Sequence, residues 1–174
     1  MAFKVYRCII WRRGIKEGVK NELLVSLKQG VLSMDFNKIE NNLIELLSKN
    51  DNNIIAVEGA TGTGKTILVN KLQKSFKDQI TVLTSEKFIK TIIDALKLKT
   101  NPIKTFESIN DDIIVIEDID YGLAGKRVTR QLIAQMLSKL LKYHKIVITG
   151  IELENRIPDI IKNNEKHLIF LRLE

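Results

Sequence analysis

The sequence predicts an α/β fold, a three-layer αβα sandwich around a mostly parallel five-stranded sheet. Two observations lead to this prediction. From residue 54 onward, short apolar runs alternate with longer segments whose apolar residues recur at helical spacing. The first apolar run also ends in a glycine-rich loop that leads directly into one of these helical segments. Such alternation produces parallel strands, which are buried because helices cover both faces of the sheet.

The elements can be assigned in order along the chain. Residues 36–49 place Phe36, Ile39, Leu43, Leu46 and Leu47 on one helical face, and residues 51–53 form a turn cluster. Further helices are expected at 65–76, from Ser85 as N-cap to about 98, at about 126–143 and, in short form, at 152–162. The expected strands are the apolar runs at 54–58, 80–84, 112–117, 145–149 and 167–173. The pair Asn101-Pro102 is expected to break the chain.

Size and composition indicate one domain of 174 residues. Residues 1–35 have the weakest periodicity and form an N-terminal segment, and residues 36–174 form the core. No apolar run approaches the length of a membrane span, and no signal peptide stands out at the N-terminus. The single cysteine, Cys8, fits a reducing cytosol, so the expected location is cytoplasmic. The net charge of +7 favours an acidic partner such as nucleic acid, although soluble surface lysines would explain it equally well.

Residues 59–66 read GATGTGKT and match the phosphate-binding pattern G-x-x-x-x-G-K-[ST]. Glycines let the backbone turn its N–H groups toward a phosphate, and the N-terminus of the next helix adds partial positive charge. Lys65 is expected to reach the β- and γ-phosphates, and the Thr66 hydroxyl is expected to bind Mg²⁺. The expected contacts to ATP or ADP come from Gly59, Ala60, Thr61, Gly62, Thr63, Gly64, Lys65, Thr66 and Ile67. A glycine-rich turn that binds nothing is the alternative.

Two acids follow the third apolar run. Glu117 and Asp118 come directly after residues 113–116, which read IIVI. In phosphate-loop NTPases a carboxylate at this point holds Mg²⁺, and an adjacent acid orients the attacking water. Glu117 and Asp118 are therefore the candidate metal-binding and catalytic residues, together with Thr66 for the metal. The alternative is that both acids only end a strand.

The chain resembles the AAA+ ATPase domain of the DnaA family of bacterial replication initiators, over roughly residues 36–173. Residues 116–126 read IEDIDYGLAGK and resemble the family's IDDIQFLAGK with one inserted residue, most simply Gly122. Residues 84–88, TSEKF, and 146–149, IVIT, also resemble family segments. This resemblance implies a P-loop NTPase fold of AAA+ type, ATP and Mg²⁺ as ligands, and Thr149 at a sensor-like position.

The resemblance also implies partners. In the family, the helix after the second strand faces single-stranded DNA within a head-to-tail filament. The corresponding nucleic-acid candidates are the lysines of this region, Lys87, Lys90, Lys97, Lys99 and Lys104. DnaA-like or helicase-loader proteins are the implied protein partners. A solvated helix face is the competing interpretation of the lysines.

The sequence departs from the family pattern in three ways. The first acid is Glu117 where the family has Asp. Residues 160–165 read IIKNNE, where an arginine finger is expected, and Arg156 lies too early to take that role. The given sequence ends at Glu174, before the helical lid and the helix-turn-helix domain of the family, so it is expected to be either a short DnaA-like protein or a fragment of a longer one.

Three hypotheses follow. The leading one is an ATP-binding DnaA- or DnaC-like module that acts in DNA replication initiation with slow hydrolysis. The second is a degenerate nucleotide-binding interaction module with little turnover. The third is a small-molecule kinase built on a phosphate loop, for which the sequence offers no arginine-rich lid.

Overall fold

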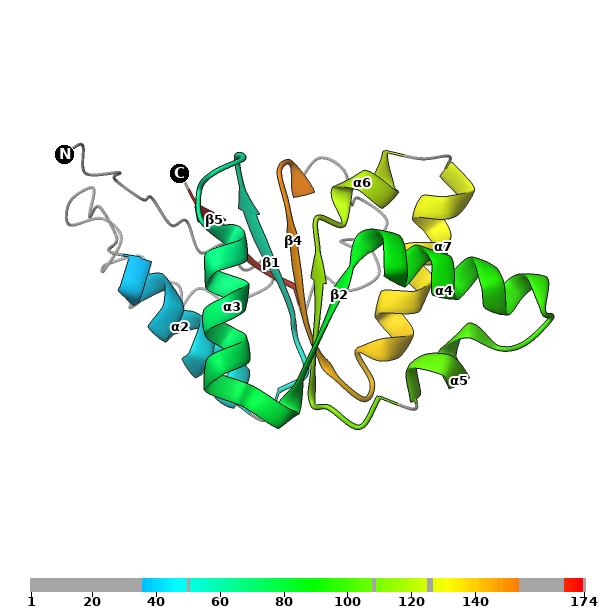
Figure 1. Cartoon of the computed structure of the whole chain (residues 1–174), viewed down its shortest axis with the longest axis horizontal. Helices are drawn as coiled ribbons and strands as arrows, with labels where there is room; N and C mark the ends of the chain where they lie inside the picture. Colours follow the sequence, from blue (N-terminus) through cyan, green and yellow to red (C-terminus); the bar gives the residue numbers. More distant parts are fainter. Residues whose placement is uncertain (1–35, 50, 108, 125–126, 154–167, 174) are drawn as a thin grey trace, which may run out of the picture.

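The computed structural model describes residues 36–49, 51–107, 109–124, 127–153 and 168–173 (Figure 1). A single sheet lies at the centre, with strand order β2-β3-β4-β1-β5. All four pairings between neighbouring strands are parallel. The strands are β1 (Ile54–Gly59), β2 (Ile80–Thr84), β3 (Ile113–Glu117), β4 (Lys145–Gly150) and β5 (Leu168–Leu173).

Helices cover both faces of this sheet, which makes three layers (Figure 1). On one face lie α2 (Phe36–Ser48) and α3 (Lys65–Phe76). On the other lie α4 (Ser85–Lys97), α5 (Pro102–Glu107), α6 (Asp120–Leu123) and α7 (Arg127–Leu140). Side chains alternate along each strand, so Ile54 and Ala56 of β1 join the core under α4 and α7, whereas Ile55 and Val57 join the core under α2 and α3. The same alternation determines which polar side chains at the strand ends lie on the same face of the sheet.

Polar contacts hold α2 in place against β4 and against α3. The Lys145 ammonium, at the start of β4, donates to the Leu47 carbonyl in the last turn of α2 at 2.7 Å. Lys71 of α3 donates to the Glu40 carboxylate of α2. A lysine on the last carbonyls of a helix satisfies groups that the helix itself leaves unpaired.

The predicted αβα sandwich is confirmed, and the five strands lie within about one residue of their expected bounds. The N-cap prediction is wrong by one residue. Thr84 has an extended backbone, and its hydroxyl accepts from the Lys87 N–H at 3.2 Å, whereas Ser85 is already helical. The expected helix at 126–143 spans Arg127–Leu140. The N-terminal segment 1–35 and most of the short helix expected at 152–162 fall outside the described residues.

Two short helices were not expected. Asn101-Pro102 lies between α4 and α5, and Pro102 is itself the first residue of α5. Proline is well tolerated at the first position of a helix. The Asn101 side-chain oxygen accepts from the Ile103 N–H at 3.1 Å and so caps this helix. The other, α6, begins two residues after Asp118, with Ile119 as its N-cap. Across the described residues, no helix is both long and apolar enough to cross a membrane.

Candidate nucleotide-binding site

The glycine-rich loop leaves the carboxyl end of β1, between β4 and β5, and enters α3 (Figure 1). All six residues of β1 are buried, so the base of the loop is fixed by the sheet. Gly62 and Gly64 have φ angles of 83° and 98°, which residues with a Cβ rarely adopt. Gly64 is also the N-cap of α3, and its carbonyl accepts from the Leu68 N–H at 2.9 Å. The loop therefore reaches the helix through the backbone geometry that the motif requires.

Gly59 is enclosed at the base of the loop. A Cβ on this residue would lie 2.5 Å from the Thr63 hydroxyl oxygen and 2.9 Å from the Leu173 carbonyl oxygen of β5. The Thr63 hydroxyl in turn donates to the Ala60 carbonyl at 2.9 Å. The first glycine of the motif is thus required by close packing rather than by a positive φ.

The Lys65 side chain folds back over the loop. Its ammonium donates to the Gly59 carbonyl at 2.6 Å and to the Ala60 carbonyl at 3.0 Å, and the residue is buried. These bonds keep a positive charge at the mouth of the loop, where anionic phosphates would meet it. Ala60, Thr61, Gly62, Thr66 and Ile67 are exposed on the loop and the first turn of α3. The structure therefore brings all nine expected nucleotide contacts together.

Glu117 ends β3, and by strand alternation its side chain lies on the face that carries α3, with Ile113 and Val115. Burial, and to a lesser extent the negative charge of the neighbouring Asp118, raise the pKa of the Glu117 carboxyl above its ordinary value. Asp118 is exposed and has a φ of 50° at the turn into α6. A half-buried carboxylate on the α3 side and a strained, exposed one beside it are suited to a cationic ligand.

Thr149 holds this acidic turn. It lies near the end of β4, is 2% exposed, and shares the α3 face with Val147. Its hydroxyl accepts from the Asp118 N–H at 3.0 Å, and its carbonyl accepts from the Ile119 N–H at 2.9 Å. The sensor-like residue is therefore in direct contact with the backbone of the candidate catalytic acid.

The residues present fit Mg²⁺. The candidate oxygen ligands are the Thr66 hydroxyl in the first turn of α3 and the carboxylates of Glu117 and Asp118 at the end of β3, and hard cations prefer such ligands. The described residues contain no group of three or more His, Cys, Asp or Glu side chains that could hold a metal alone. Phosphate oxygens of a nucleotide would supply further ligands to a metal held by these protein oxygens.

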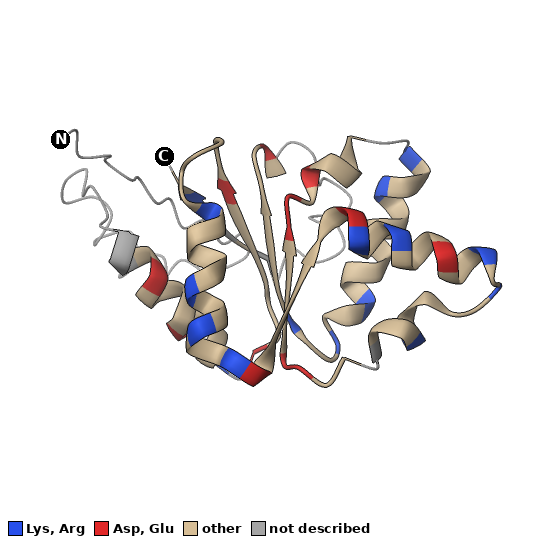
Figure 2. Ribbon diagram, viewed as in Figure 1, with Lys and Arg blue, Asp and Glu red and all other residues tan. Residues whose placement is uncertain are grey.

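The candidate nucleic-acid lysines lie on another part of the molecule, along α4 and α5 (Figure 2). All five are exposed. Lys90 and Lys97 are seven residues apart on α4, so they share one helical face. Acidic residues interrupt this surface: Lys97 lies 3.9 Å from Asp94. The lysines therefore form a mixed, mainly basic surface that is separate from the phosphate loop.

One ion pair beside the loop is not expected from the sequence. Glu58, immediately before Gly59, accepts from the Arg172 guanidinium, with Nε at 2.9 Å and Nη2 at 2.7 Å from Oε1. Glu58 pairs with Arg172 across the β1–β5 ladder. The signal in the sequence is an acid near the carboxyl end of one apolar strand, β1, and a base near the carboxyl end of another, β5. Strand order is needed to make them neighbours.

Comparisons with known proteins agree with this geometry. The sequence profile of the family described as the bacterial DnaA ATPase domain matches residues 26–172. Chromosomal replication initiator protein DnaA of Citrifermentans bemidjiense is 32% identical over 114 residues, which cover 62% of this chain and 25% of that protein. The DnaA protein of Geobacter sulfurreducens is 31% identical over 114 residues, which again cover 62% of this chain and 25% of that protein. The chain thus spans about a quarter of the length of the curated relatives that it matches.

Solved structures show the same fold. Domain III of the Thermotoga maritima replication initiation protein DnaA has a TM-score of 0.62 at 20% identity, covering 79% of this chain and 62% of that one. Replication initiator DnaA bound to AMPPCP and single-stranded DNA has a TM-score of 0.59 at 19% identity, with coverage of 79% and 44%. The DnaC helicase loader has a TM-score of 0.58 at 15% identity, with coverage of 81% and 92%. The profile match over most of its length shows that this chain belongs to the family of the bacterial DnaA ATPase domain.

Proposed function

We propose that this chain binds ATP and ADP with Mg²⁺ at residues 59–67 and acts in, or regulates, the initiation of DNA replication. The observation that carries the proposal is the loop itself: its backbone is already turned, and the Lys65 ammonium lies over it on two carbonyls. Membership of the DnaA ATPase domain family supports the setting in replication, and the single cysteine supports a cytoplasmic location.

Each residue has a role in this proposal. Lys65 exchanges its contacts with the Gly59 and Ala60 carbonyls for contacts with phosphate oxygens, at little cost because the charge is already in place. The Thr66 hydroxyl and the Glu117 carboxylate hold Mg²⁺, which when bound neutralises charge between the phosphates and the acids. Asp118 orients water, and Thr149 fixes the turn on which Asp118 sits.

We further propose that hydrolysis by this chain alone is slow. An arginine supplied to the transition state is worth about 10³–10⁵ in rate, and residues 160–165 contain none. A second chain stacked head to tail is the expected source of such a charge. If no partner supplies one, the module uses nucleotide to set its shape and bind a DnaA-like or helicase-loader protein, with little turnover.

Weak binding of single-stranded DNA is the finer part of the proposal. A solved DnaA structure is bound to AMPPCP and single-stranded DNA. Here the exposed lysines of α4 and α5 would contact the phosphates of a strand without reading its sequence, so binding should weaken steeply with salt. The rival interpretation is a solvated helix face with no ligand.

The central test is calorimetric titration of Mg²⁺-ATP into wild type and Lys65→Ala. Loss of a charge-assisted contact worth about 1.5–3 kcal/mol should weaken binding by about ten- to a hundredfold. Lys74→Ala, an exposed lysine near the end of the same helix, is the matched control and should bind as the wild type does. Equal affinity of Lys65→Ala and Lys74→Ala would refute the site. Transfer of phosphate to a nucleoside would instead favour the kinase hypothesis.

A further inference from the structure

Glu58 places an acidic side chain directly before a loop that is expected to bind anionic phosphates. It is the last residue before the phosphate loop, its side chain is 10% exposed, and the loop is built to attract anions. The Lys65 ammonium donates to the carbonyl of the very next residue, Gly59. An unpaired carboxylate here would repel the phosphates of a nucleotide and would compete with them for the lysine.

Arg172 supplies the opposing charge. Two of its nitrogens contact Oε1 of Glu58, and its own side chain is 39% exposed. Among the last two residues of each strand in the described sheet, Arg172 is the one base, whereas Glu58 and Glu117 are acids. Arg172 is therefore the strand residue at this edge whose positive charge directly faces Glu58.

The pair lies on the face of the sheet opposite α3. Glu58 alternates with Ile54 and Ala56, whose side chains belong to the core under α4 and α7. It pairs with Gly150 across the β1–β4 ladder, where the Leu153 side chain and a carboxylate oxygen of the buried Asp120 fill the space beside the glycine. Arg172 therefore acts on the loop from behind, by charge, rather than by touching a nucleotide bound on the α3 side.

From this geometry we infer that Arg172 is an electrostatic positioning residue for nucleotide binding: it neutralises Glu58 so that the phosphate loop can accept a polyphosphate. This inference rests on the proposed nucleotide-binding function. It is distinct from a purely structural role, in which the pair would only stabilise the β1–β5 ladder. The electrostatic and the structural role predict different ATP affinities for the double variant that lacks both the Glu58 carboxylate and the Arg172 guanidinium.

The experiment is a charge cycle measured by Mg²⁺-ATP calorimetry at low salt. Arg172→Met should weaken ATP binding by about five- to tenfold, because it removes the positive charge that faces Glu58 beside the loop. Glu58→Gln should bind ATP as tightly as the wild type or more tightly. The double variant should return to near wild-type affinity, and Arg172→Lys should keep it. High salt should shrink the effect of Arg172→Met, because salt screens the repulsion.

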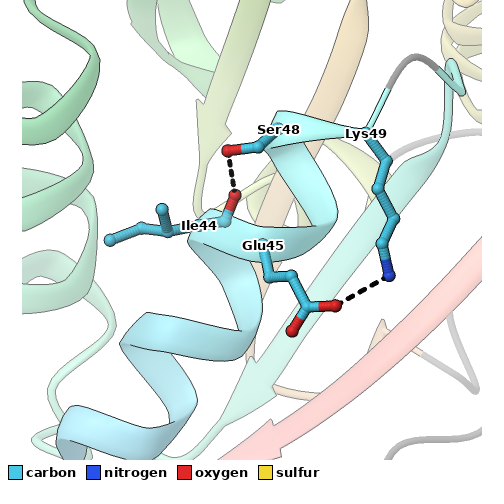
Figure 3. A network of polar contacts seen from close by, with 4 residues as sticks. All are labelled: Ile44, Glu45, Ser48 and Lys49. Atoms are coloured by element: carbon cyan, nitrogen blue, oxygen red, sulfur yellow. Dashed lines mark hydrogen bonds and ion pairs between the residues drawn. The ribbon is translucent and has the colours of Figure 1, made fainter.

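The matched control is Lys49→Met. Lys49 forms an ion pair with Glu45 at 2.9 Å beside the last turn of α2, where the Ser48 hydroxyl also donates to the Ile44 carbonyl (Figure 3). The Lys145 contact with Leu47 places this end of α2 near the start of β4, at the edge opposite the loop. Removing this base should leave ATP binding unchanged.

Three results would overturn the inference. Arg172→Met could bind as the wild type does. It could lose as much affinity in the Glu58→Gln background as in the wild type, which would mean that arginine acts independently of the acid. Glu58→Gln could itself bind ATP more weakly than the wild type, which would indicate a structural role for the pair. This single variant distinguishes the two roles even if Arg172→Met does not fold. Absence of ATP binding by the wild type would refute the proposed function itself, and this inference with it.

Discussion

Gly59→Ala tests whether the base of the phosphate loop is fixed by packing. The added Cβ would meet the Thr63 hydroxyl oxygen at 2.5 Å, the Leu173 carbonyl oxygen at 2.9 Å and the Leu173 Cβ at 3.0 Å. The threonine can rotate, although it would lose its bond to the Ala60 carbonyl. The Leu173 atoms belong to the β1–β5 ladder and cannot move without disturbing it. The methyl group must therefore displace either the loop or the edge strand.

The expected magnitude follows from overpacking, which typically costs about 1–3 kcal/mol. For a domain of this size each kcal/mol lowers the melting temperature by about 2–4 °C, so a fall of about 2–12 °C is expected. ATP affinity should fall as well, because the Gly59 carbonyl holds the Lys65 ammonium. If half of the packing cost appeared in binding, affinity would fall by about two- to twelvefold.

The assay is a thermal melt by far-UV circular dichroism, together with ATP calorimetry on the same preparations. Ser75→Ala, at an exposed position of α3, is the matched control and should change neither. Gly59→Ala with Thr63→Ala separates the two clashes: a full recovery would assign the cost to the hydroxyl, and no recovery would assign it to Leu173. A Gly59→Ala variant that melts and binds ATP like the wild type would refute the packing argument.

The remaining predictions concern charge and turnover. Because the pKa of Glu117 is raised in the fold, its ionisation destabilises the folded state as pH rises above the ordinary carboxylate value of 4.5. Glu117→Gln should therefore melt at a higher temperature than the wild type near neutral pH without nucleotide, and the difference should vanish in acid. A coupled phosphate-release assay on the purified chain should detect far less than one ATP hydrolysed per second, and many per second would contradict the missing-arginine argument. Lys90→Glu with Lys97→Glu should reduce single-strand binding at low salt in fluorescence anisotropy while sparing ATP affinity. The same reversal at Lys139 and Lys142 should not, and equal binding by both pairs would favour a solvated face.

Much of the fold could be predicted from the sequence because its strongest signals are local. A buried parallel strand appears as a continuous apolar run, and the phosphate loop has its glycines, lysine and threonine at fixed spacing. Both signals place the motif, residues 59–66, at the junction of β1 and α3 without any knowledge of strand order. Glu117 and Asp118 could be placed at the end of β3 for the same reason, since they directly follow an apolar run of four buried residues.

Other features were missed because their signals were ambiguous. Pro102 ends one segment and begins another, and only the capping bond from Asn101 shows that a helix starts there. Gly122 looked like an inserted residue in a family motif. In the structure it belongs to α6, and a Cβ on it would lie 2.0 Å from the end of the Ile89 side chain. Gly122 thus packs against the Ile89 side chain of α4, a contact that spacing along the sequence could not show.

The pair of Glu58 and Arg172 shows the deeper limit of motif-based prediction. The two residues are 114 positions apart, and the edge strand β5 carries no motif residue at all. The same register that sets Arg172 against Glu58 also sets Leu173 against Gly59. The last two residues of β5 thus support the loop twice, once by charge and once by packing. Because the loop's geometry depends on a strand outside its motif, a matching motif without that strand would not be sufficient for a binding-competent loop.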